Sequence, residues 1–169
     1  KEKVSALACS SCDNFVVSAG GGDDSVFVFD FSSGEVLYEL RDHSAEINAV
    51  AISRDESIIS VGGDDQKIFL YSSNDGNLFK TIDLSHKERD IFSLCFHPEG
   101  HRFWVHDRSK PINIIKYNKQ GNRLLSGGDD KNLVLYEVGT DYSAELLWQY
   151  PSEIKALSFS EENEDIVFV

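Results

Sequence analysis

The chain has 169 residues and a formal net charge of −13, from 29 acidic and 16 basic side chains. This length predicts a single domain with a sizeable core, and the acidic balance argues against direct nucleic-acid binding or docking on an anionic membrane. No apolar run reaches the roughly 20 residues of a spanning helix, and we expect no membrane insertion. The three cysteines argue against a disulfide framework and favour an intracellular location, cytoplasmic or nuclear.

Methionine is absent and the first residue is Lys1, so we expect these residues to belong to a longer chain. The sequence holds 11 Phe and 6 Tyr but only 3 Pro. Together with its many β-branched residues, this composition favours sheet over helix.

Five short segments with alternating apolar residues predict strands that each turn one face to a core. Each segment is followed by Ser, Gly or charged residues, which are typical of a turn. The five begin at Val4, Ile47, Ile91, Ile112 and Ile154.

Three longer segments repeat a strand, a Gly-Asp-Asp turn and a strand with apolar residues on both faces. They span Ser18–Asp30, Ser60–Ser72 and Leu125–Glu137. Continuous apolar residues predict burial on both sides of a sheet. A further strand is predicted after each segment, in Gly34–Leu40, Gly76–Ile82 and Glu145–Tyr150. Four antiparallel strands per repeat, stacked radially, predict an all-β propeller.

These repeats resemble the WD-repeat family over essentially the whole chain. In that family a loop His, a second-strand Ser or Thr, a turn Asp and a third-strand Trp form a hydrogen-bonded set within each blade. The resemblance implies these structural positions for His43, His86 and His106 (loops), Ser126 (second strand), Asp24, Asp65 and Asp130 (turns), and Phe29, Tyr71 and Tyr136 (third strands). Repeats one and two have Gly20 and Val61 in place of the Ser, so we expect a partial network.

The spacing of the first strands predicts an incomplete propeller of about four blades, with a truncated third blade. The distance in sequence from the start of the third first strand to the start of the fourth is about half of the distance between the other starts. From the family's period we expect roughly 20–25 residues to be missing near Val105 and His106. Residues 1–169 are expected to form part of one propeller, with blades at 4–41, 47–84, 91–105 (partial), 112–150 and 154–169 (partial).

The motifs that might carry chemistry favour structural roles. The Gly-Asp-Asp turns lack the Lys and the helix of a phosphate loop and match no calcium loop, so we interpret their Asp side chains as bonded to their own turns. Cys9 and Cys12 form a CxxC without a second ligand pair or a βαβ context. The sequence predicts no enzyme, no cofactor and no metal site.

Partner binding is the function that the resemblance implies. The paired aspartates of the turns are expected to cluster at the His43 end of the blades and to attract a basic partner segment. Family members present partners with residues just before the first strands, here Glu46, Asp90, Lys110 and Glu153.

The sequence therefore predicts a non-enzymatic scaffold that mediates protein–protein interactions within a multi-subunit intracellular complex. An alternative is a non-catalytic propeller subunit of an RNA-processing or RNA-modification complex. A third hypothesis, a propeller enzyme, would need a cluster of titratable groups in the central channel.

Overall fold

The computed structural model describes residues 3–20, 24–85, 90–100, 103–107, 114–138, 144–159 and 166–167. Its elements in these ranges are β-strands, grouped into antiparallel sheets that follow one another along the chain. None of the described residues forms a helix long and apolar enough to cross a membrane.

Three of the sheets have four strands paired in chain order. The first contains β1 (Val4–Cys9), β2 (Phe15–Gly20), β3 (Val26–Asp30) and β4 (Val36–Leu40). The second contains β5 (Ile47–Ile52), β6 (Ile58–Gly63), β7 (Lys67–Ser72) and β8 (Leu78–Asp83). The third of these contains β11 (Ile114–Tyr117), β12 (Arg123–Gly127), β13 (Asn132–Glu137) and β14 (Ala144–Gln149).

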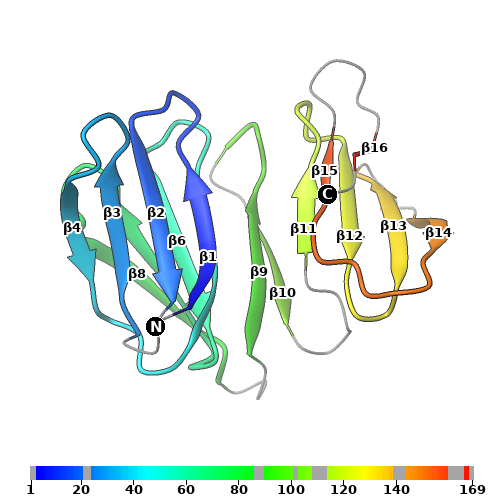
Figure 1. The fold of residues 1–169 in the computed structure, drawn as a ribbon, viewed down its shortest axis with the longest axis horizontal. Helices are drawn as coiled ribbons and strands as arrows, with labels where there is room; N and C mark the ends of the chain where they lie inside the picture. The colour runs from blue at the N-terminus through cyan, green and yellow to red at the C-terminus, as the bar shows by residue number, and fades with distance from the viewer. Residues whose placement is uncertain are drawn as a thin grey trace.

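The two remaining sheets have only two strands each in the described residues. One, the third blade in chain order, pairs β9 (Ile91–Phe96) with β10 (Phe103–Asp107). It stands between the sheet of β5 to β8, the second blade, and the sheet of β11 to β14, the fourth blade, where Figure 1 shows it beside β11. The other pairs β15 (Ser158–Phe159) with β16 (Ile166–Val167).

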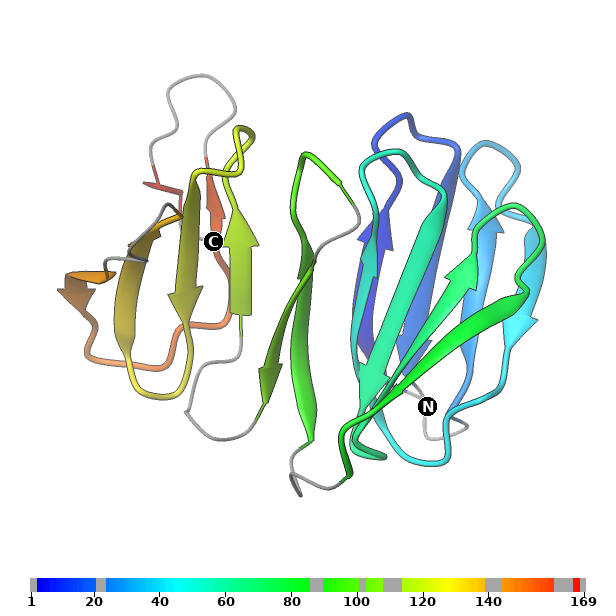
Figure 2. The ribbon, with the colours of Figure 1, turned by 180° about the vertical axis from the view of Figure 1, so that it is seen from behind.

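The blades stand side by side around a common inner edge made by their first strands. Strand β1 lies against β5, β5 against β9, β9 against β11, and β11 against β15. Figure 2, from behind, shows the two-stranded blade (green) between two four-stranded ones. The prediction of an incomplete propeller with a truncated third blade is confirmed.

The apolar core lies between blades rather than within them. Val28 of the first blade and Ile47 and Tyr71 of the second share one buried cluster, and a second cluster joins the second blade to β9. Between the two-stranded blade and the fourth blade, Ile115 and Leu124 are the buried members of the apolar cluster in the described part of the chain. Each blade thus depends on its neighbour to remove its faces from water.

The truncated blade leaves one face of the fourth blade poorly covered. Tyr71 is 1% exposed, whereas Tyr136, at the same position of β13, is only half-buried. Val134 is likewise half-buried, although its counterpart Phe69 is buried. Two strands cover less of a neighbouring sheet than four do.

Two expectations about strand positions were wrong. His106, expected in a loop, lies within β10 opposite Ser93, because antiparallel pairing with β9 continues past Val105. The strand expected to start at Ile154 is short: the Ile154 N–H donates to the Gly128 carbonyl at 3.0 Å. This bond ties Ile154 to the fourth blade, and pairing with β16 begins only at Ser158.

Candidate functional site

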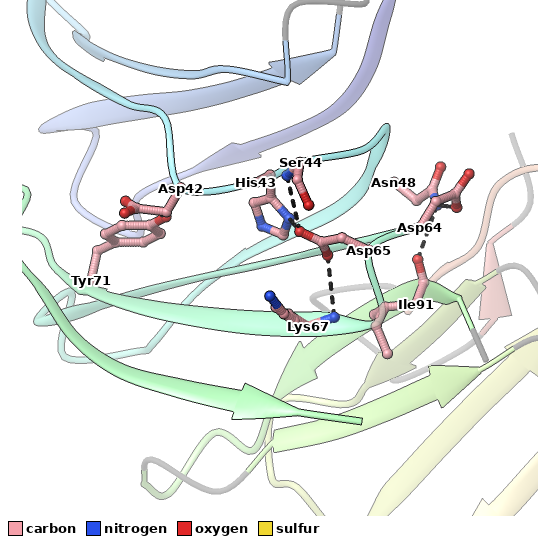
Figure 3. Close-up of polar contacts among 9 residues, drawn as sticks. All are labelled: Asp42, His43, Ser44, Asn48, Asp64, Asp65, Lys67, Tyr71 and Ile91. Carbon is pink, nitrogen blue, oxygen red and sulfur yellow. Dashed lines mark hydrogen bonds and ion pairs between the residues drawn. The ribbon is translucent and has the colours of Figure 1, made fainter. Parts of the chain in front are cut away.

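The best-defined polar cluster joins the loop before β5 to the turn between β6 and β7 (Figure 3). Asp65 Oδ2 lies 2.8 Å from His43 Nδ1 and accepts a hydrogen bond from the Ser44 N–H at 3.2 Å. Asp65 Oδ1 accepts the Lys67 N–H at 3.2 Å. This single carboxylate therefore ties the loop and the turn of one blade together.

The cluster is buried and its charge is stabilised locally. The side chains of His43 and Asp65 are 1% and 4% exposed. Burial, the largest influence, raises the pKa of Asp65, but the bonds and charge from His43 and the backbone N–H bonds outweigh it and hold the pKa below its ordinary value. The His43 ring packs edge-on against Phe69, with centroids 4.6 Å apart.

Tyr71 occupies the third-strand position where the resemblance implied a Trp. Its hydroxyl donates to Asp42 Oδ2 at 3.1 Å (Figure 3). Burial and then the Asp42 carboxylate raise the pKa of Tyr71 far above its ordinary value, so the phenol stays protonated. Phe29 and Tyr136 occupy the same position as Tyr71 on the third strands of their blades, where they pair with Val16 and Leu124 on the second strands.

The expected hydrogen-bonded set is split between two blades. His43 Nε2 and Ser126 Oγ are buried without a hydrogen-bond partner among the described residues. Val61 pairs with Phe69 in the second blade, and Ser126 pairs with Val134 at the same position of the fourth blade. In the second blade, valine therefore occupies the position where the family has the Ser or Thr that bonds to the loop His. The second blade has the His and Asp, and the fourth has the Ser and Asp130.

Replacing Ser126 with alanine is expected to raise the free energy of unfolding by about 1 kcal/mol, because an unpaired buried hydroxyl carries a desolvation cost. The matched control is Ser60→Ala on β6. Ser60 is also buried, but its Oγ donates to the Ala51 carbonyl at 3.3 Å, so this change should cost about 1 kcal/mol. Urea unfolding measures the free energy of unfolding of both variants. A lower value for Ser126→Ala than for the wild type would show that the Ser126 hydroxyl has a hydrogen-bond partner.

The turn position assigned to Asp24 was wrong. Counted back from the third strand, Asp24 takes the place of Gln66 and Lys131, and all three have a positive φ, of 54°, 63° and 64°. The blade-one counterpart of Asp65 is therefore Asp23, which lies outside the described residues. The reason is one additional residue between β2 and β3 compared with β6 and β7.

The same shift corrects the second-strand position of the first blade. Ser18, not Gly20, lies opposite Phe27 in the register of Val61 and Ser126. In the fourth blade, Asp130 Oδ1 accepts the Asn132 N–H at 3.1 Å, as Asp65 Oδ1 accepts the Lys67 N–H in the second blade.

Asp64, the other aspartate of this turn, takes part in a contact between blades. Asn48 Nδ2 donates to Asp64 Oδ1 at 2.6 Å and to the Ile91 carbonyl at 3.1 Å. Figure 3 shows this bridge beside the His43 cluster. Both aspartates of the second turn therefore serve the fold, and this turn adds less acidic surface than expected. Sequence reasoning missed Asn48 because a single polar residue in a strand carries no distinctive pattern.

The residues proposed for partner contact are only partly described. Glu46 is exposed, and its carbonyl accepts the Asp64 N–H at 2.9 Å, which fixes its backbone beside the turn. Glu153 is also exposed and lies 3.5 Å from Lys155 Nζ. Asp90 is half-buried. Lys110 and the loop residue His86 lie outside the described residues.

Metal and thiol chemistry find little support in the described part of the chain. No group of three or more His, Cys, Asp or Glu there could hold a metal ion. Cys9 and Cys12 are exposed free thiols. The negative charge of Glu56 raises the pKa of Cys12, which lowers its thiolate fraction and its reactivity.

Comparison with known proteins agrees with this geometry. The family model described as "WD domain, G-beta repeat" matches residues 1–30, 34–72 and 99–137, more than half of the chain. The crystal structure of the Cps50 (Swd1) β-propeller domain of Myceliophteria thermophila is similar, with a TM-score of 0.77 and 18% identity. The match covers 98% of this chain and 62% of that one, so this chain spans less than two thirds of the solved domain. No curated protein sequence matches.

Proposed function

Because this chain belongs to the WD domain, G-beta repeat family, we propose that it is a non-catalytic scaffold that docks protein subunits within an intracellular multi-subunit complex. Proteins of this family are generally interaction scaffolds. One observation carries the non-catalytic part of the proposal: His43 Nδ1 and the Asp65 carboxylate, at the turn end of the second blade, are bonded to each other and buried.

The His43–Asp65 pair illustrates this. A histidine oriented by an aspartate is an arrangement that hydrolases use, but a general base must reach a substrate. The imidazole is 1% exposed and its ring is packed on Phe69. The pair is therefore placed to hold a loop rather than to transfer a proton.

The proposed docking face is the turn end of the blades, with Glu46, Asp90, Lys110 and Glu153 as contact residues. The exposed carboxylate of Glu46, and that of Glu153 beside Lys155, are acceptors that suit a basic partner segment. Exposed charges of this kind affect association rate and partner choice more than the free energy of binding.

The test is affinity purification of the tagged full-length protein with and without nuclease. We expect a defined set of proteins in near-stoichiometric amounts, retained after nuclease and depleted when Glu46→Lys and Glu153→Lys are combined. The matched control is Glu35→Lys, because exposed Glu35 precedes β4 and therefore lies at the opposite end of its blade.

Two outcomes would contradict the proposal. Loss of all partners after nuclease would instead favour the RNA-complex alternative. Equal recovery with the Glu46 and Glu153 changes and with the Glu35 change would show that the docking face lies elsewhere.

A further inference from the structure

A second surface lies at the other end of the blades, where the inner strands finish. Glu46 and the β6–β7 turn adjoin the start of β5, so the carboxyl end of β5 lies away from the proposed docking face. There the ends of β1, β5, β9 and β11 surround an open hollow of about 470 Å³, within the range of about 300–1,000 Å³ typical of ligand sites. We call it the inner hollow.

The inner hollow has a charge opposite to that of the whole chain. Arg54, Lys116 and Lys119 line it, and no Asp or Glu is among its described lining residues, in a protein of net charge −13. None of the three cations forms an ion pair with a described residue. Grouped cations without carboxylate partners attract anionic ligands, and a concave low-dielectric wall strengthens that field.

Apolar side chains accompany these cations. Leu7, on the lining of the hollow, is 62% exposed, and the lining residues Val50 and Ile52 are only partly buried. Asp55 and Glu99 line an adjoining hollow, which shares Arg54 and Pro98 with the inner hollow. The inner hollow therefore combines positive charge with uncovered apolar surface.

We propose that the inner hollow binds an acidic peptide segment of a partner protein. Its carboxylates pair with Arg54, Lys116 and Lys119, and an aliphatic side chain between them covers Leu7. This binding surface is separate from the proposed docking face, so either proposal can fail without the other.

The observations favour a peptide over a nucleic acid. Single-stranded nucleic acids need aromatic faces for base stacking. Among the described lining residues, the phenyl and phenol rings are those of Phe96 and Tyr117. Tyr117 is already covered by the His97 ring, with centroids 4.9 Å apart, and Phe96 is buried. A long polyanion would also meet the net negative charge of the chain.

The test measures fluorescence anisotropy of a labelled peptide of alternating Glu and Leu, titrated with the full-length protein at low salt. We expect saturable binding that weakens as salt increases. Each of Lys116→Gln and Lys119→Gln should weaken binding about threefold, and the triple change with Arg54→Gln about 20-fold, because exposed ion pairs each contribute modestly.

Three controls make the result specific. Lys80→Gln removes an exposed cation from β8, away from the inner strands, and should leave binding unchanged, as should Glu46→Lys at the docking face. A peptide with Gln in place of Glu should not bind. The proposal is overturned if the acidic peptide does not bind, if the triple change has no effect, or if an oligouridine RNA binds more tightly through the same three residues.

Discussion

Replacing Asp65 with alanine is expected to lower the free energy of unfolding by about 3 kcal/mol, because it leaves a buried imidazole and two backbone N–H groups without their acceptor. The lost bonds are those to His43, Ser44 and Lys67, at 2.8, 3.2 and 3.2 Å. Urea unfolding followed by tryptophan fluorescence measures the change.

Asp75→Ala is the matched control, since Asp75 also accepts hydrogen bonds within its turn. It accepts the Asn77 N–H at 3.2 Å and the Asn77 side-chain amide at 2.6 Å, but it is exposed. Its removal should cost under about 1 kcal/mol. Equal losses for the two aspartates would contradict a special role for the buried cluster.

The contribution of Asp65 should also depend on pH. Its pKa is held below its ordinary value in the folded protein, so the unfolded chain takes up the proton first and stability falls as pH decreases. The difference between wild type and Asp65→Ala should be full above about pH 5 and shrink below about pH 4. A difference that grows on acidification would show that the carboxylate does not stabilise the fold in this way.

The sequence predicts the propeller well because its signal is a repeat. Apolar alternation and Gly-Asp-Asp turns recur, so an error in one copy is corrected by the others. The assignment of Asp24 failed because the first repeat has a longer turn than the second. Aligning the Gly-Asp-Asp sequences pairs Asp24 with Asp65, whereas the strand register pairs Asp24 with Gln66. An inserted residue in a turn shifts sequence positions without moving the strands.

Contacts between blades could not be predicted in the same way. His97 is half-buried, and its Nε2 lies 3.1 Å from the Gly121 carbonyl oxygen of the next blade. Asn48 likewise bonds to the Ile91 carbonyl. Such bonds depend on how two sheets are angled, and a one-dimensional pattern does not contain that angle.

The missing residues near Val105 and His106 and the blade ranges stay predictions. The half-buried state of Tyr136 supports the first, because two further strands in the third blade would cover that face. Sequencing full-length transcripts would test it. A natural chain with two strands in this blade would show that the fold tolerates the uncovered face.

Replacing Gly62 with valine is expected to lower the free energy of unfolding by about 3 kcal/mol, through overpacking between the second and third blades. A Cβ at Gly62 would lie 2.6 Å from Ile91 Cγ2 and 3.3 Å from Leu94 Cδ1. The contact recurs at Gly127, where a Cβ would lie 2.9 Å from Ile154 Cγ2. The small residue on the second strand therefore sets how closely the next blade approaches.

The control is Gly100→Val, because a Cβ at Gly100 meets no atom within 4 Å and the change should stay within about 0.5 kcal/mol. A double-mutant cycle with Ile91→Ala then isolates the contact. If the valine methyls clash with Ile91, truncating Ile91 relieves them, and the double variant should lose clearly less stability than the sum of the single losses. Additive losses would place the strain of Gly62→Val elsewhere in the strand. A coupled pair would show that blade stacking depends on a side chain of one repeat fitting against the bare backbone of the previous one.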